Sequence, residues 1–143
     1  MELEIKRREK EGIAILDLTG PLTAGLAATA LRDAMRAELA QGPKNVILNL
    51  EHVDYIDSTG LGALVMCFTA QRKSSGRLVL LNLNRRQLEL LVLTKLSTVF
   101  EIFDDEQQAV NSFFPNRHIT HFDILRFIEK QRSDADDEAD PLR

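Results

Sequence analysis

A hydroxyl-bearing motif is present in the chain at Asp57-Ser58-Thr59-Gly60-Leu61-Gly62. It follows a strand-like run over residues 45–50 and a short acidic loop, and the residues after it have a helical pattern. Ser58 is therefore expected where a loop meets a helix, and the unpaired N–H groups at such a junction tolerate an anion. Three roles fit this position: a phosphorylation switch, a catalytic nucleophile, or a helix cap formed by Ser58 or Asp57.

A catalytic role for Ser58 lacks the residues that it would need. The nucleophile elbow of hydrolases has glycine two positions before and two positions after the serine. Ile56 occupies the first of these positions, and only Gly60 satisfies the second. His52 is near in sequence, but none of the three histidines has the context of a catalytic triad. These observations disfavour a serine hydrolase.

Phosphate-cradling and metal-binding roles are disfavoured as well. The chain has no P-loop sequence, and Gly60-Leu61-Gly62 lacks the third glycine of the dinucleotide fingerprint. Gly60 and Gly62 are instead expected to allow close backbone approach at the helix start, or helix–sheet packing. Glu51, Asp54 and Asp57 make the loop acidic, and the two histidines of residues 118–121 fall in a linker-like segment. We therefore expect neither a metal nor a cofactor.

Phosphorylation of Ser58 is compatible with the physics of the position. A phosphoserine adds a charge of roughly −1.5 to −2 and three acceptor oxygens, which the start of a helix tolerates. The phosphate would stand beside Asp54 and Asp57, and like charges that face one another in an interface cost several kcal/mol. Because about 1.4 kcal/mol is tenfold in affinity, partner binding would fall by roughly two orders of magnitude or more.

Composition places the chain among globular proteins. Its 143 residues are a usual length for one domain, and 44% of them are apolar. A formal net charge of −4 argues against nucleic acid as a partner. No apolar run approaches the ~20 residues that cross a bilayer, and the N-terminus has no signal-peptide pattern. The single cysteine, Cys67, falls in an apolar helical stretch and is expected to be buried, which fits a cytoplasmic protein without membrane insertion.

Strand-like and helix-like segments alternate along the chain. Alternating or continuous apolar runs predict strands, and apolar residues at helical spacing predict helices. A hairpin at residues 9–12 is expected to place the first two strands at a sheet edge, and a Gly20-Pro21 break follows them. The expected strands lie at 3–7, 12–18, 45–50, 78–81 and 99–103, and the expected helices at 24–40, 59–74, 84–95 and 105–114.

This order, ββαβαβαβα, predicts an α/β fold: a single domain with a mixed β-sheet, helices packed against it, and a C-terminal helical extension. The carboxyl ends of the central strands should meet at one rim of the sheet. Functional groups of α/β proteins are usually found at that rim, and the loop that carries Ser58 is expected there.

The composition changes at Pro115. We assign residues 1–114 to the domain, 115–132 to a linker and a short amphipathic helix, and 133–143 to an acidic disordered tail. The apolar arc of the short helix would either pack on its own domain or form a docking or dimerisation element. The sequence leaves both possibilities open.

The motif and its surroundings resemble the STAS domain, in particular the bacterial anti-sigma-factor antagonists. The resemblance runs from residue 49 through the motif, includes residues 18–20, 74–78 and 100–103, and covers roughly residues 1–114. It implies a non-enzymatic protein whose Ser58 is phosphorylated by an anti-sigma factor acting as a serine kinase, and dephosphorylated by a phosphatase. The unphosphorylated domain would bind the anti-sigma factor and release the sigma factor. The implied partner-binding residues are Thr23, Asp54, Asp57, Ser58, Thr59, Gly60, Leu61 and Gly62.

One position departs from the family pattern. After Leu-Thr-Gly the family usually has an acidic residue, Leu and then Asp, whereas this chain has Pro21-Leu22-Thr23. The family's Asp supports kinase recognition, so Thr23 implies an altered partner or a weaker substrate; alternatively, Thr23 caps the first helix. Two other functions remain open: a constitutive STAS subunit of a larger assembly, such as a lipid-transport ATPase or a signalling complex, and a small-ligand or nucleotide sensor.

Overall fold

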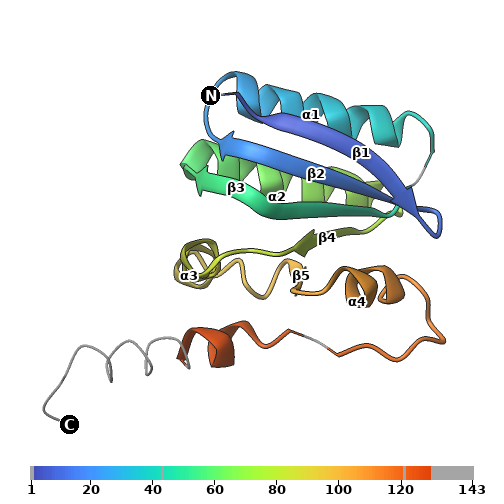
Figure 1. Ribbon diagram of the computed structural model, residues 1–143. Coiled ribbons are helices and arrows are strands. Elements are labelled where there is room, and N and C mark those ends of the chain that lie inside the picture. The colour runs from blue at the N-terminus through green and yellow to red at the C-terminus, as the bar shows by residue number, and fades with distance from the viewer. Residues whose placement is uncertain (1, 43, 121, 130–143) are drawn as a thin grey trace, which may run out of the picture.

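The computed structural model describes residues 2–42, 44–120 and 122–129. Its elements follow the predicted order and confirm the α/β fold, a five-stranded sheet with helices packed against it (Figure 1). Among the described residues, no helix has both the length and the apolar character that crossing a membrane requires. The elements are β1 (Glu4–Lys10), β2 (Ile13–Leu22), α1 (Leu26–Leu39), β3 (Val46–Ile56), α2 (Ser58–Lys73), β4 (Leu78–Leu81), α3 (Arg85–Leu93), β5 (Glu101–Phe103) and α4 (Glu106–Asn111).

The sheet has the strand order β1-β2-β3-β4-β5. β1 and β2 form an antiparallel hairpin that turns at Glu11 and Gly12, whereas β2, β3, β4 and β5 are parallel. Only β1 of the hairpin lies at a sheet edge, because β2 also pairs with β3; the expectation of two edge strands is wrong. The carboxyl ends of the four parallel strands come out at one rim of the sheet.

β2 and β3 are both longer than the sequence predicts. β2 continues through the Gly20-Pro21 pair to Leu22, and β3 continues through acidic residues 51–54 to Ile56. The expected break and the expected acidic loop are therefore wrong. The two strands pair with each other as far as Leu22 and Ile56, and a register shift between Gly20 and Pro21 accommodates the proline. Both strands thus run beyond Leu81, where β4 ends.

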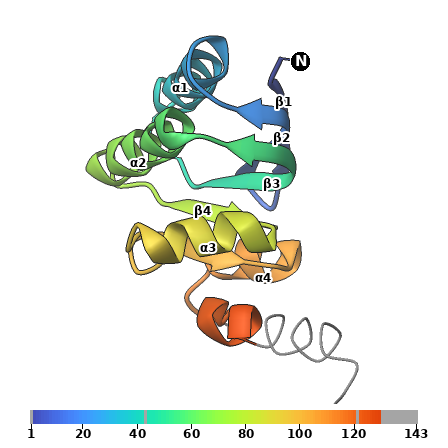
Figure 2. The same cartoon turned by 90° about the vertical axis from the view of Figure 1, so that its left-hand side faces the viewer.

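Apolar layers cover both faces of the sheet, with α1 and α2 on one side (Figure 2) and α4 on the other. Alternate strand residues point to opposite faces, so the continuous apolar runs of β3 and β4 serve both layers. Cys67 of α2 is buried in the first layer, as predicted, and burial raises the pKa of its thiol to about 11. The first layer includes Leu16, Leu31, Leu48, Leu64 and Leu80, and the second Ile15, Ile47, Val79, Phe103 and Val110.

The segment that follows α4 is attached to the domain. Phe113, Phe114 and Ile119 pack against the second apolar layer. Arg117 forms an ion pair with Glu11 of the β1–β2 turn (2.7 Å), and its guanidinium lies over the ring of Phe114. The segment therefore contributes to the cover of one sheet face.

Residues 124–129 form a short helix within the predicted extension. Ile128 of this helix is buried, so the helix packs on its own domain, which was one of the two possibilities that the sequence left open. The predicted acidic tail at 133–143 lies outside the described residues.

Candidate functional site

The Ser58 motif lies at the carboxyl-end rim of the sheet, as the sequence predicts. β3 ends at Ile56, Asp57 is the N-cap residue of α2, and Ser58 is the first residue of that helix. The backbone N–H of Asp57 donates to the carbonyl of Leu22 (3.3 Å). This hydrogen bond links the junction between β3 and α2 to the end of β2. The Ser58 side chain is exposed, and its hydroxyl has no hydrogen-bond partner among the described residues.

The carboxylate of Asp57 joins two segments that are far apart in sequence. One oxygen accepts a hydrogen bond from the N–H of Gly60 (2.7 Å) and so caps α2. The other oxygen accepts from the N–H of Ala24 (3.1 Å), between β2 and α1. These two N–H groups, Gly60 first and then Ala24, hold the pKa of Asp57 below its usual range. Asp57 thus caps α2, and the Ser58 hydroxyl does not take part in capping.

The two glycines of the motif have different surroundings. A Cβ at Gly60 would lie 2.0 Å from the carbonyl oxygen of Leu22, so only glycine lets the start of α2 lie against the end of β2. A Cβ at Gly62 would have no heavy atom within 4 Å, and this residue is exposed. The helix–sheet packing expected of these glycines is confirmed for Gly60 and is wrong for Gly62, where close backbone approach stays a prediction. Leu61, between them, is buried in the first apolar layer.

The exposed face of α2 is open beside the hydroxyl. Ser58, Gly62 and Met66 are spaced four residues apart, so they lie on the same side of the helix. Gly62 leaves a gap between the hydroxyl and the exposed side chain of Met66. Thr59, next to Ser58, is exposed as well. This face offers a hydroxyl, accessible backbone and a flexible apolar side chain, which together suit the close approach of another protein.

The groups around the motif do not form a catalytic arrangement. His52, the histidine nearest in sequence, is exposed on β3, and its imidazole lies 4.0 Å from the carboxylate of Glu51. Asp57 already accepts backbone hydrogen bonds, and Asp54 is exposed on β3. In the described part of the chain, no three His, Cys, Asp or Glu side chains are grouped to hold a metal ion. The site therefore consists of an accessible hydroxyl at an acidic rim of the sheet.

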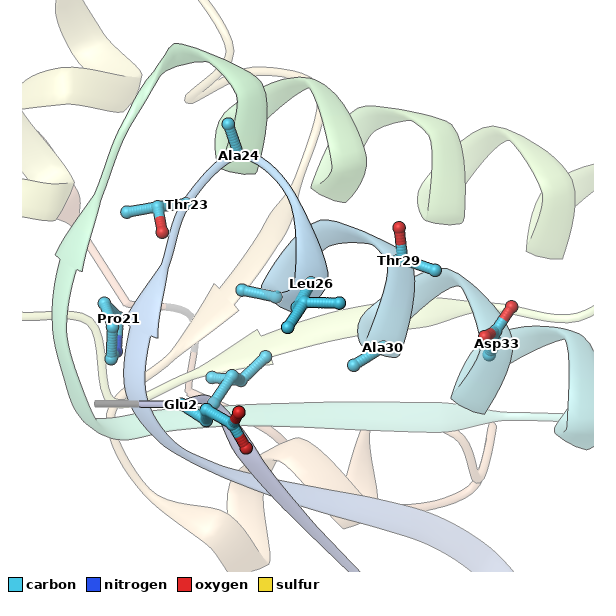
Figure 3. A pocket seen from close by; sticks show the side chains of 10 residues that line it. Glu2, Pro21, Thr23, Ala24, Leu26, Thr29, Ala30 and Asp33 are labelled. Atoms are coloured by element: carbon cyan, nitrogen blue, oxygen red, sulfur yellow. The ribbon is translucent and has the colours of Figure 1, made fainter.

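Thr23 lies at a groove beside the Ser58 junction. The groove has a volume of about 610 Å³ and is bordered by the end of β2, by α1 and by the residues before β1 (Figure 3). Glu2 and Asp33 provide its carboxylates. Thr23 does not cap α1, because Gly25 is the N-cap residue and none of the described side chains caps this helix; that possibility is wrong. Only the backbone carbonyl of Thr23 bonds to α1, accepting from the N–H of Ala28 (3.2 Å).

Two residues at the start of α3 complete the rim, and neither is among the site residues predicted from the sequence. Asn84 caps α3 by accepting from the N–H of Gln87 (2.8 Å), and the Gln87 side chain donates to the carbonyl of Val53 (2.8 Å). Val53 lies on β3 beyond the end of β4, where no neighbouring β4 residue can bond to its carbonyl. The Gln87 side chain supplies that hydrogen bond instead. The Asn84-x-x-Gln87 spacing of a capping box signals the helix start. Only the tertiary structure brings Gln87 to Val53.

Comparisons with known proteins agree with this fold. A sequence profile of the STAS domain matches residues 4–109. The anti-sigma-B factor antagonist of Listeria monocytogenes is 34% identical over 104 residues, which cover 71% of this chain and 88% of the relative.

Two solved structures share the fold. An anti-sigma factor antagonist from Mycobacterium paratuberculosis has a TM-score of 0.66 at 20% sequence identity. The matched region covers 77% of this chain and 92% of the antagonist's chain. The Bacillus cell fate determinant SpoIIAA, in its phosphorylated form, has a TM-score of 0.61 at 20% sequence identity. The matched region covers 77% of this chain and 99% of the SpoIIAA chain.

Substitution of Gly60 tests the close contact between α2 and β2. We expect Gly60→Ala to lower the free energy of unfolding by about 3 kcal/mol or more, because the new methyl group would overlap the backbone of Leu22. Gly62→Ala is the matched control, and it should raise stability by about 0.5–1 kcal/mol, since it adds a helix-favouring residue in open space. Urea denaturation of both variants measures the difference. Equal stability of the two variants would contradict the contact.

Acid titration tests the role of Asp57. Because its folded-state pKa is depressed, its contribution to stability is complete above the unfolded-state pKa of about 3.9 and is lost as pH falls through the folded-state pKa. Asp57→Asn keeps an oxygen for Gly60 but places an NH₂ group against the N–H of Ala24 or loses that bond. We expect this variant to be less stable at pH 7 and to lose less stability than the wild type between pH 5 and 3.

Asp54→Asn is the control for this titration, because Asp54 is an exposed carboxylate three residues upstream on the same strand. Thermal unfolding followed by circular dichroism gives the pH profile of each protein. An Asp57→Asn profile that runs parallel to that of the wild type would show that the carboxylate does not join the two segments.

Proposed function

Because the chain belongs to the STAS domain family, we propose that it is an anti-sigma-factor antagonist controlled by phosphorylation of Ser58. The unphosphorylated protein binds an anti-sigma factor and so frees a sigma factor. The anti-sigma factor also acts as a serine kinase on Ser58, and the phosphorylated protein is then released. A phosphatase restores the binding form. These steps take place in the cytoplasm, and the protein itself catalyses no reaction.

The observation that carries this proposal is the different use of two adjacent side chains. Asp57 caps α2 and binds Ala24, whereas the exposed Ser58 hydroxyl bonds to none of the described residues. A kinase can therefore reach the hydroxyl without displacing it from a contact on which the fold depends. SpoIIAA, which shares the fold, is itself known in a phosphorylated form.

A phosphate on Ser58 changes the surface more than it changes the fold. At the first residue of α2, its charge of roughly −1.5 to −2 is favoured by the helix dipole. The charge of Asp57 is already compensated by two N–H groups. A partner on this rim, however, would meet the phosphate together with the exposed carboxylates of Glu51 and Asp54. Like charges that meet in an interface cost several kcal/mol, which is sufficient for release.

The partner surface is the exposed face of α2 and the adjoining rim. Ser58, Thr59 and Gly62 are exposed there and are proposed to contact the anti-sigma factor directly. Gly60 and Leu61 are buried and would act indirectly, by holding α2 against β2 and the sheet. The open backbone at Gly62 lets a partner approach closely beside the hydroxyl.

A paired substitution tests the switch. Ser58→Ala should retain binding to the cognate anti-sigma factor, because it removes only a hydroxyl that bonds to none of the described residues. Ser58→Asp should weaken binding by roughly a hundredfold, because it adds negative charge to the acidic rim. Affinity is measured by calorimetry with each purified anti-sigma factor of the same organism. Mass spectrometry after incubation with the anti-sigma factor and ATP should find phosphate on Ser58 of the wild type.

Equal affinities of the two variants would reject charge-gated release and would favour a constitutive interaction subunit. Absence of phosphate on Ser58 after incubation with every cognate kinase would reject the phosphoacceptor role. Thr59→Ala is the control for the site of modification, and it should be phosphorylated as the wild type is.

Substitution of Thr23 tests its proposed effect on kinase recognition. Thr23→Asp restores the residue type that the family usually has, one position before the Ala24 N–H that binds Asp57. We expect a severalfold higher initial rate of Ser58 phosphorylation. Thr29→Asp, in the same groove but on α1, is the matched control and should leave the rate unchanged. A Thr23→Asp rate equal to that of the wild type would remove Thr23 from the recognition surface.

A further inference from the structure

An apolar groove runs along the exposed side of α3. It consists of two hollows, with volumes of about 330 and 240 Å³, which share Glu89 and Leu93. The end of β3 borders the first hollow, and the helix of residues 124–129 borders the second. We call this surface the α3 groove. Its apolar residues are Tyr55, Ile56, Leu90, Val92, Leu93, Leu125 and Ile128.

Large apolar side chains are concentrated in this groove although water can reach them. Leu93 is 81% exposed, Leu125 55% and Tyr55 52%, and these are three of the six most exposed large apolar side chains among the described residues. Single exposed apolar residues are normal on protein surfaces, but a continuous band of them marks an interaction site. The other three, Leu26, Met66 and Val99, do not line the groove.

The extension beyond the matched STAS region builds half of this groove. The profile match ends at residue 109, and the second hollow needs Leu125, Ile128 and Glu129. Figures 1 and 2 both show the helix of residues 124–129 beside α3. The extension thus adds binding surface to the domain, in a hollow that adjoins the one bordered by the end of β3, the strand that leads into the Ser58 motif.

The charges around the groove restrict what can occupy it. Among the described residues that line it, three have carboxylates, Asp54, Glu89 and Glu129, and one, Arg86, is basic. In the sequence, Glu129 is followed by residues 130–143, which hold five acidic and three basic residues. Lys130 and Arg132 come first in this stretch, and the five acids follow from Asp134 on. The described lining of the groove is therefore acidic, and the sequence that follows it has a net negative charge.

This charge disfavours two occupants from the chain itself. A second copy would bring the same carboxylates face to face across the interface, which costs affinity. Residues 130–143 carry the same sign of charge as the groove, and Leu142 is the only large apolar side chain among them. A partner with apolar residues on one side and basic residues on the other matches both features of the groove.

We propose that the α3 groove is a second docking surface, which binds an amphipathic helix with apolar anchors and a basic face. Anchors three or four residues apart on the partner helix enter the hollows on either side of Leu93. Lysine or arginine side chains of that helix meet Asp54, Glu89 and Glu129. This recognition uses no atom of Ser58. Asp54 is shared with the rim that the anti-sigma factor is proposed to meet, whereas Glu89 and Glu129 belong to the α3 groove alone.

The test uses the full chain and a synthetic peptide of roughly four helical turns, with leucine on one face and lysine on the other. The ¹⁵N-labelled protein is titrated with the peptide by NMR at an ionic strength of about 0.15 M. We expect shift changes confined to the residues of the α3 groove. Leu93→Asp should weaken binding by roughly tenfold or more. Leu26→Asp is the matched control, because Leu26 is 76% exposed on α1, and it should bind as the wild type does.

A second peptide, with glutamate in place of lysine, should not bind. The proposal is overturned if both peptides bind equally, if Leu93→Asp binds as the wild type does, or if the shifts lie elsewhere. A dimer that Leu93→Asp dissociates in sedimentation experiments would assign the groove to a second copy. Nuclear Overhauser contacts from residues 130–143 to Leu93 would assign it to the chain itself. The peptide titration contains no anti-sigma factor. Its results would therefore stand even if the proposed function were rejected.

Discussion

The close approach of Gly60 to the carbonyl of Leu22 is the contact on which the site depends. It is possible because position 60 has no side chain, and because β2 and β3 run together to the same level of the rim. With α2 held in this place, one carboxylate, that of Asp57, can reach both the N–H of Gly60 and the N–H of Ala24. The direction of α2, the path of the chain into α1 and the exposure of Ser58 all follow from this arrangement.

Stability and recognition depend on different atoms of the motif. The groups that hold the fold are backbone atoms, the Asp57 carboxylate and the buried side chain of Leu61. The groups that a partner can contact, Ser58 and Thr59, are exposed. A charge added at Ser58 can therefore alter binding while the packing beneath it stays as it is. This separation is what a reversible modification requires, since the protein must fold equally well in both states.

The extension shows how a small domain acquires a further surface. The second sheet face is covered by α4 together with Phe113, Phe114 and Ile119, so the chain after α4 is part of the packing. Its attachment directs the following helix against α3, where Ile128 is buried. The apolar arc that the sequence indicated in this helix is thus divided. Ile128 serves the fold, and Leu125 remains exposed beside Leu93.

The sequence by itself determined the element order, the α/β class and the position of Ser58 at a helix start, because these follow from local hydrophobic periodicity and helix-start residues. It did not determine the full length of β2 and β3, because an acidic or proline-containing segment becomes a strand only when a neighbouring strand supplies hydrogen bonds. The sequence also could not distinguish Gly60 from Gly62. Whether a glycine is required depends on what lies opposite, and only the tertiary structure brings Leu22 to one of them and leaves the other facing open space.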